Sequence, residues 1–141
     1  MAEFYYTKEG DIQTFDLGKG PFSKLVIDPS QLPEDQRSGG AKQLLAAAAL
    51  SCYTQALQVA LDSRGANYTN FKAKVSMDLG SNDLGQSRVQ RMTIETRLDL
   101  PEEDREIFER VEKIMKQGCM VVGSLKDSIA INYDLQANFE E

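Results

Sequence analysis

Residues 38–54 read SGGAKQLLAAAALSCYT, and this stretch decides the fold that we expect. It opens a longer segment, residues 41–63, in which apolar side chains recur at spacings of three and four, as on one face of a helix. Alanine is the best helix former, and its small side chain lets other backbones approach closely. Gly65 supplies the glycine that commonly follows a helix end. We therefore expect a long alanine-rich helix at the centre of the fold, surrounded by other layers.

The rest of the chain is expected to form strands and a second helix. Aromatic or alternating apolar patterns predict strands at 4–7, 12–17, 22–27, 68–79, 88–99 and 129–139. A second helix is expected to open at Pro101 and end at Gly118, with a short helix over 119–125. Val89 is out of phase with its strand, which indicates a β-bulge or a shifted start. This order predicts one α+β domain over residues 1–141, dominated by antiparallel pairing.

Composition excludes several function classes. The 141 residues include 22 acidic and 16 basic side chains, and a net charge of −6 makes nucleic acid a poor partner. The absence of histidine removes Ser-His-Asp and Cys-His catalysis and histidine-ligated metal sites. Two cysteines are too few for a disulfide scaffold or a four-thiolate metal site. The first residues lack a signal-peptide pattern, and polar residues interrupt the longest apolar stretch, so we expect a cytoplasmic protein without a membrane span.

Cys52 and Cys119 are the remaining candidates for chemistry. Free cysteine often packs as a small inert hydrophobe, and that interpretation stays open. A mid-helix cysteine gains little from the helix dipole, so a reactive Cys52 would need a cation such as Lys8 or Arg37 brought over by the fold. Cys119 is expected at the start of a short helix, where free N–H groups favour a thiolate. Local physics alone therefore ranks Cys119 as the more acidic thiol.

Two segments resemble signatures of a known family. Residues 38–54 are similar to the central-helix signature of the OsmC/Ohr family, the osmotically inducible and organic-hydroperoxide-resistance proteins. Residues 116–125, KQGCMVVGSL, are similar to its second-cysteine signature, and a final alternating strand follows in the family too. The resemblance covers nearly the whole chain. It implies the OsmC-like α+β fold, in which antiparallel sheets wrap around a central alanine-rich helix and two chains intertwine as a homodimer.

The same resemblance implies a thiol-dependent peroxidase that needs no metal or organic cofactor. In the family, the cysteine matching Cys52 attacks an organic hydroperoxide and becomes a sulfenic acid, and the cysteine matching Cys119 resolves it as a disulfide. A small thiol or a dithiol protein then reduces that bond. The family thus assigns the nucleophile to Cys52, against the local ranking. We follow the family, because a cation supplied by the fold can outweigh the dipole of a short helix.

Three positions depart from the pattern of the family's peroxidases. Lys42 stands where they carry a glutamate, Lys8 lies nearest their hairpin arginine, and Met120 replaces their proline. A lysine supplies charge but not the planar fork of arginine. Lys8, Arg37 and Lys42 are therefore the candidates for activating the thiolate or binding substrate, and weak or altered activity is expected. Two alternatives stay open: a non-catalytic dimer that binds a small hydrophobic ligand at the subunit interface, and a protein whose two cysteines are packed and inert.

Overall fold

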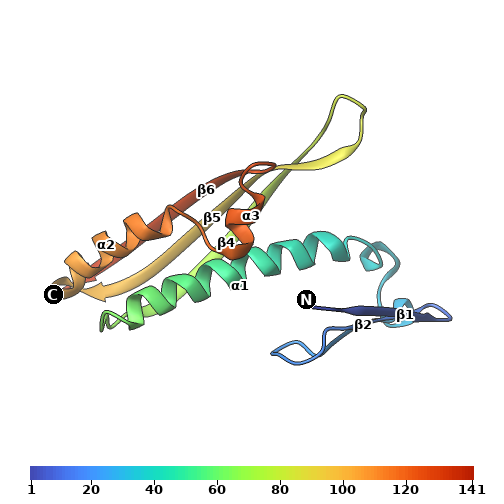
Figure 1. Cartoon of the computed structure of the whole chain (residues 1–141), viewed down its shortest axis with the longest axis horizontal. Coiled ribbons are helices and arrows are strands. Elements are labelled where there is room, and N and C mark those ends of the chain that lie inside the picture. The colour runs from blue at the N-terminus through green and yellow to red at the C-terminus, as the bar shows by residue number, and fades with distance from the viewer. The chain divides into compact units, whose positions relative to one another are not determined.

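A computed structural model describes all residues, 1–141. The chain divides into two compact units, Met1–Gly40 and Ala41–Glu141. Figure 1 labels the helices and strands along the chain. The expectation of one domain over residues 1–141 stays a prediction.

Residues 1–40 form a three-stranded antiparallel sheet. Its strands are β1 (Tyr5–Glu9), β2 (Ile12–Asp16) and β3 (Lys24–Ile27), adjacent in that order. Gly10 joins β1 to β2 with a φ of +57°, a left-handed conformation that suits a tight hairpin turn. After β3 the chain makes two single 3₁₀ turns, η1 (Pro29–Gln31) and η2 (Glu34–Gln36), in the segment rich in proline and glycine.

The long alanine-rich helix is α1 (Gly40–Asp62). Its fully buried side chains recur at every fourth position, at Ala49, Tyr53, Leu57 and Leu61. On other sides of the helix, Leu44 is 44% exposed and Val59 is 67% exposed. By length and composition α1 could also cross a membrane, and 28% of its most apolar window is buried within the chain. The chain itself therefore covers one face of α1 and leaves apolar side chains open on another.

The second sheet has the order β4 (Thr69–Ser81), β5 (Ser87–Pro101), β6 (Ala130–Glu140). The hairpin of β4 and β5 is antiparallel, and its register shifts between Asp78 and Leu79, where Leu79 pairs with Val89. This shift confirms the bulge expected from the phase of Val89. In contrast to the other three pairings, β6 runs parallel to β5. A parallel neighbour requires a crossover, and the chain makes it through η3 (Glu102–Asp104), α2 (Arg105–Met115) and α3 (Met120–Leu125).

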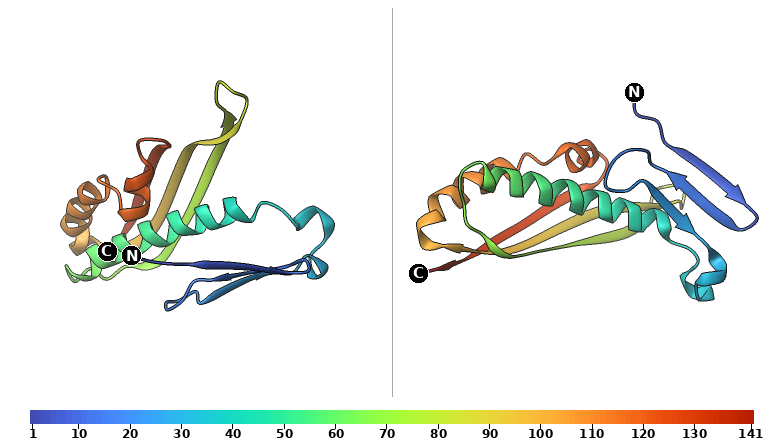
Figure 2. Two further views of the ribbon diagram at one scale, coloured as in Figure 1. Left: turned by 45° about the vertical axis from the view of Figure 1, so that its right-hand side comes forward. Right: turned by 90° about the horizontal axis from the view of Figure 1, so that it is seen from below.

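One face of this sheet carries the core. The even-numbered residues of β5 from Met92 to Leu100 are all buried, whereas the odd-numbered residues between them are half-buried. Figures 1 and 2 show α1 and α2 on the same side of the sheet. The opposite face is polar and carries the ion pairs Lys74–Glu95 (3.0 Å) and Arg97–Asp134 (2.8 Å). The alternation along each strand predicts this arrangement, with apolar side chains on one face of the sheet and polar side chains on the other.

The second helix begins later than expected. Pro101 is the last residue of β5, one 3₁₀ turn follows, and α2 starts at Arg105. Asp104 is buried at this junction, and its carboxylate accepts a hydrogen bond from the main-chain N–H of Asn67 at 2.9 Å. The bond ties the segment before β4 to the start of α2, so it fixes where the crossover leaves the sheet.

Candidate functional site

The two cysteines lie together in residues 41–141. Cys52 occupies the middle of α1, and Cys119 directly precedes α3. The main-chain N–H of Val121, in the first turn of α3, donates a hydrogen bond to Sγ of Cys52 at 3.4 Å. The thiol of Cys119 in turn interacts with Cys52. Both cysteines are free and half-buried, so the fold brings two thiols from distant parts of the sequence side by side.

The environment of Cys119 opposes its ionisation. Burial is the largest cause of the raised pKa of this thiol, and its hydrogen bond with Cys52 raises the pKa further. The N–H groups of Val122 and Val121 act in the opposite direction, as expected at a helix start. The N-terminal effect that led to the ranking of Cys119 as the more acidic thiol is therefore present but outweighed. Local sequence patterns do not reveal how deeply Cys119 is buried, and this burial decides that its pKa is raised.

A close approach fixes the turn that carries Cys119. Gly118 has a φ of +83°, and a Cβ at this position would lie 2.9 Å from the hydroxyl oxygen of Tyr133 and 3.5 Å from the backbone of Gly123. A contact of 2.9 Å is shorter than real Cβ atoms tolerate without a shift. Only glycine fits this place without strain, because both the backbone conformation and the space exclude a side chain. The hydroxyl of Tyr133 thus packs against Gly118, the residue directly before Cys119.

Two stacked tyrosines flank the thiols. Tyr53 and Tyr133 lie with ring centroids 5.3 Å apart and planes 19° from parallel. Burial raises the pKa of Tyr133, and the neighbouring Cys119 and Cys52 raise it further, so its phenol stays protonated at neutral pH. Neither tyrosine was among the candidates named from the sequence. The signals were present: Tyr53 follows Cys52 directly, and Tyr133 alternates inward on the last strand.

Of the three candidate cations, only Lys42 lies in the same unit as the thiols, and it does not contact them. Lys42 is exposed in the first turn of α1, about 15 Å along the helix axis from Cys52. Lys8 is exposed in β1, and Arg37 follows η2, where its Nε donates a hydrogen bond to the carbonyl of Leu32 at 3.1 Å. Lys8 and Arg37 belong to the other unit, so their roles stay predictions. The groups that do reach Sγ of Cys52 are the main-chain N–H of Val121 and the thiol of Cys119.

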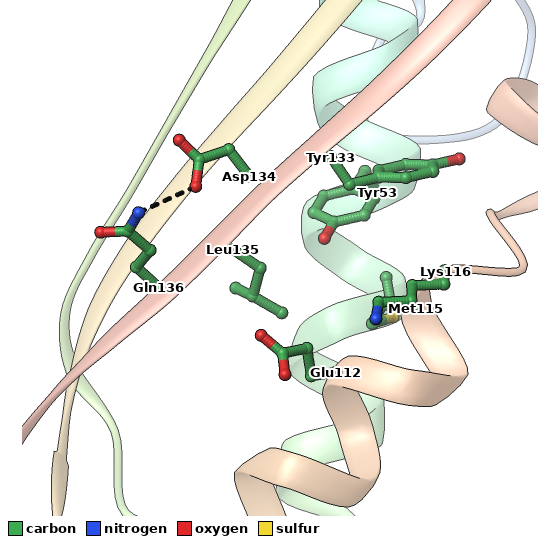
Figure 3. A pocket seen from close by; sticks show the side chains of 8 residues that line it. All are labelled: Tyr53, Glu112, Met115, Lys116, Tyr133, Asp134, Leu135 and Gln136. Atoms are coloured by element: carbon green, nitrogen blue, oxygen red, sulfur yellow. Dashed lines mark hydrogen bonds between the residues drawn. The ribbon is translucent and has the colours of Figure 1, made fainter.

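A pocket of about 340 Å³ opens beside the tyrosine pair. Figure 3 shows it between the end of α2, with Glu112 and Met115 in the helix and Lys116 directly after it, and β6, which contributes Leu135. The hydroxyl of Tyr53 points toward the space between Leu135 and Glu112, whereas the hydroxyl of Tyr133 points away from it. The chain has no group of three or more His, Cys, Asp or Glu side chains that could hold a metal ion.

Residues 37–134, which hold both cysteines and their surroundings, match the family of OsmC-like proteins. The chain belongs to the OsmC family. It is 26% identical over 136 residues to the protein named peroxiredoxin OsmC of Escherichia coli K12, and the match covers 92% of each chain. The resemblance stated from the two cysteine signatures is thereby confirmed.

Solved structures share the fold of this OsmC family member. An OsmC-like protein from Mycoplasma pneumoniae superposes with a TM-score of 0.70 at 12% identity, over 100% of this chain and 98% of that one. The organic hydroperoxide resistance protein OhrB of Bacillus subtilis superposes with a TM-score of 0.58 at 15% identity, over 96% of this chain and 98% of that one. These likenesses confirm the predicted OsmC-like α+β fold around a central helix.

Proposed function

We propose that this protein is a thiol-dependent peroxidase that reduces organic hydroperoxides, with Cys52 as the nucleophile and Cys119 as the resolving thiol. The observation that carries the proposal is the adjacency of the two sulfurs, with Sγ of Cys52 held by the N–H of Val121. A main-chain N–H aimed at a sulfur stabilises negative charge there. The kinship with a protein named a peroxiredoxin, at 26% identity, supports the same chemistry.

The reaction proceeds in three balanced steps. The Cys52 thiolate attacks the outer oxygen of the hydroperoxide, the O–O bond breaks, and the alcohol leaves once its oxygen has taken up a proton. Cys52 is now a sulfenic acid. The sulfur of Cys119 attacks the sulfur of Cys52, water leaves, and a disulfide forms. Two thiols of a reductant, a small thiol or a dithiol protein, then return both cysteines to thiols and become a disulfide themselves.

The different environments of the two thiols suit these two roles. Sγ of Cys52 accepts a hydrogen bond from the main-chain N–H of Val121, which holds this sulfur in place for attack on the peroxide. Cys119 has a raised pKa and keeps its proton until the sulfenic acid is formed. The neutral phenol of Tyr133, packed against Gly118, holds the turn of the resolving thiol in place. No metal or organic cofactor takes part in this scheme.

The open side of α1 supports a homodimer as the working unit. Leu44 and Val59 are exposed along this helix, and a second copy of the chain would cover them. Lys8, Arg37 or Lys42 would then approach the thiolate or the substrate within the assembled dimer. A net charge of −6 disfavours binding to nucleic acid, and we place the protein in the cytoplasm.

Peroxide consumption tests this function. The reduced protein is mixed with cumene hydroperoxide and dithiothreitol, and the remaining peroxide is measured over time. We expect turnover by the natural protein and none above buffer by Cys52→Ser. Without dithiothreitol, which itself reduces a sulfenic acid, Cys119→Ser should complete one reduction and accumulate a sulfenic acid that dimedone traps. Undiminished turnover by Cys52→Ser would show that the nucleophile is assigned wrongly.

A second candidate function is a non-catalytic dimer that holds a small hydrophobic ligand at the subunit interface. The observation that favours it is the lysine at position 42, where the family's peroxidases carry a glutamate. In that case both thiols stay unreactive toward cumene hydroperoxide, and the purified protein carries a ligand that native mass spectrometry detects.

A further inference from the structure

We propose that the pocket between α2 and β6 binds a small zwitterion, an α-amino acid with an apolar side chain. The pocket lies within residues 41–141 and is lined by side chains of α1, α2 and β6. Its volume of about 340 Å³ falls at the lower end of ligand sites, which suits a molecule of this size. The binding is independent of the peroxidase chemistry, because neither cysteine lines the pocket.

The hydroxyl of Tyr53 is the group that most needs a ligand. Tyr53 is fully buried, and its oxygen has no hydrogen-bond partner anywhere in the protein. Figure 3 shows this hydroxyl directed into the pocket. Burial raises the pKa of Tyr53, and the neighbouring Tyr133, Cys119 and Glu112 raise it further, so the phenol keeps its proton and remains a donor. A buried donor without an acceptor destabilises the fold, and a bound acceptor would remove that cost.

Two charged groups of opposite sign stand beside this hydroxyl. Glu112 lies in the last turn of α2 and Lys116 directly follows the helix, and both line the pocket. Neither makes an ion pair or a side-chain hydrogen bond, although their spacing would allow one. The ammonium of Lys116 and the hydroxyl of Tyr53 can both bind a carboxylate of the ligand. The carboxylate of Glu112 can bind an ammonium of the ligand. A ligand that carries both groups satisfies all three.

The other walls of the pocket determine which side chain the ligand carries. Met115 and Leu135 provide apolar walls, and the ring of Tyr133 adds an aromatic one. Asp134 at the rim is already engaged by Arg97 and Gln136, so it does not compete for the ligand's ammonium. A simple anion would meet the unpaired Glu112, and a simple amine would leave Tyr53 and Lys116 without an acceptor. The walls therefore favour an apolar side chain attached to a zwitterionic head.

Titration with L-leucine and two of its derivatives tests the proposal. The ¹⁵N-labelled reduced protein is followed by NMR, and the affinity is measured by calorimetry. We expect L-leucine to bind with a dissociation constant of about 1 mM or lower and to shift the amides around Glu112, Lys116 and Leu135. N-acetyl-L-leucine, which lacks the ammonium, and L-leucine methyl ester, which lacks the carboxylate, should each bind about tenfold more weakly.

Variants connect the binding to the named groups. Lys116→Met, Glu112→Gln and Tyr53→Phe should each weaken L-leucine binding about tenfold, because each removes one partner of the head group. Lys113→Met and Glu109→Gln are the matched controls, since both residues are exposed on α2 outside the pocket, and their binding should equal that of the natural protein. Cys52→Ser should also bind normally, which separates this proposal from the peroxidase. No shifts with L-leucine, equal binding of N-acetyl-L-leucine, or unchanged affinity in Lys116→Met and Glu112→Gln would each overturn the proposal.

Discussion

Gly118 is the residue whose backbone most directly positions Cys119. Because its φ is +83° and a Cβ would lie 2.9 Å from the hydroxyl of Tyr133, we predict that Gly118→Ala lowers the free energy of unfolding by about 1–3 kcal/mol. Formation of the Cys52–Cys119 disulfide should slow as well. Urea unfolding and the rate of thiol loss after peroxide addition check the two effects.

Gly123 provides the control for this substitution. It lies in α3, and a Cβ there meets nothing within 4 Å. Gly123→Ala should therefore leave the protein as stable as before or raise the free energy of unfolding by up to about 1 kcal/mol. Equal stability of the Gly118→Ala and Gly123→Ala proteins would contradict the proposed close packing against Tyr133.

Three side chains near the site predict a loss of stability at alkaline pH. The folded protein raises the pKa of Cys119 above its ordinary 9.0, and the pKa values of Tyr53 and Tyr133 above 10.0. The folded state thus holds these protons more tightly than the unfolded state. The contribution of these three groups to the free energy of unfolding is fully present below pH 9. It is lost as the pH rises through 9 and 10 toward the pKa values of the folded protein.

Urea unfolding of the reduced protein at a series of pH values measures this dependence. We expect the free energy of unfolding to fall in the alkaline range and the fall to be smaller in Tyr53→Phe, because that variant lacks the most deeply buried titrating group. A free energy that stays level past pH 10 in the natural protein would show that these phenols are not desolvated as described.

At the scale of elements, one buried carboxylate joins the start of β4 to the start of α2. The buried carboxylate of Asp104 accepts a hydrogen bond from the N–H of Asn67 at 2.9 Å, and we predict that Asp104→Ala costs about 1–3 kcal/mol of unfolding free energy by removing this bond to a charged acceptor. Asp104→Asn keeps an oxygen acceptor and should lose less. Thermal and urea unfolding of both variants decide the question, and an equal loss in the two would mean that the hydrogen bond contributes nothing.

The elements themselves were largely predictable from local patterns. Alanine content and spacing placed α1, and period-two alternation placed β4, β5 and β6 within a few residues. The late start of α2 after Pro101 was missed, because proline is equally suited to the first turn of a helix and to the end of a strand. The parallel direction of β6 was missed as well, since alternation is the same for both directions of a strand.

The site was predictable only in part, because long-range packing builds much of it. Cys52 and Cys119 stand out in the sequence by their type and their surroundings. The donor to Cys52 does not, because it is the main-chain N–H of Val121, and any residue there would supply it. The raised pKa of Cys119 likewise depends on burial by distant elements. Long-range packing decides both, and no local pattern encodes it.

At the scale of the whole molecule, the open side of α1 predicts self-association. We expect the natural protein to sediment as a dimer and Val59→Glu to shift it toward the monomer, because a charge would be placed on a side chain that is 67% exposed in the single chain and covered in the dimer. Leu84→Glu is the matched control: Leu84 is 82% exposed in the β4–β5 hairpin, away from α1, and its substitution should not change the mass. A monomeric natural protein at micromolar concentration would contradict the proposed assembly.

The central claim is that Cys52 and Cys119 form a redox pair. The most direct measurement is the intact mass of the reduced protein after one equivalent of cumene hydroperoxide, followed by mapping of the cross-linked peptides under non-reducing conditions. We expect a chain lighter by two hydrogen atoms, with Cys52 joined to Cys119 within the chain and neither thiol open to alkylation. An unchanged mass with both cysteines still alkylated, or oxygen added without a disulfide between them, would contradict it.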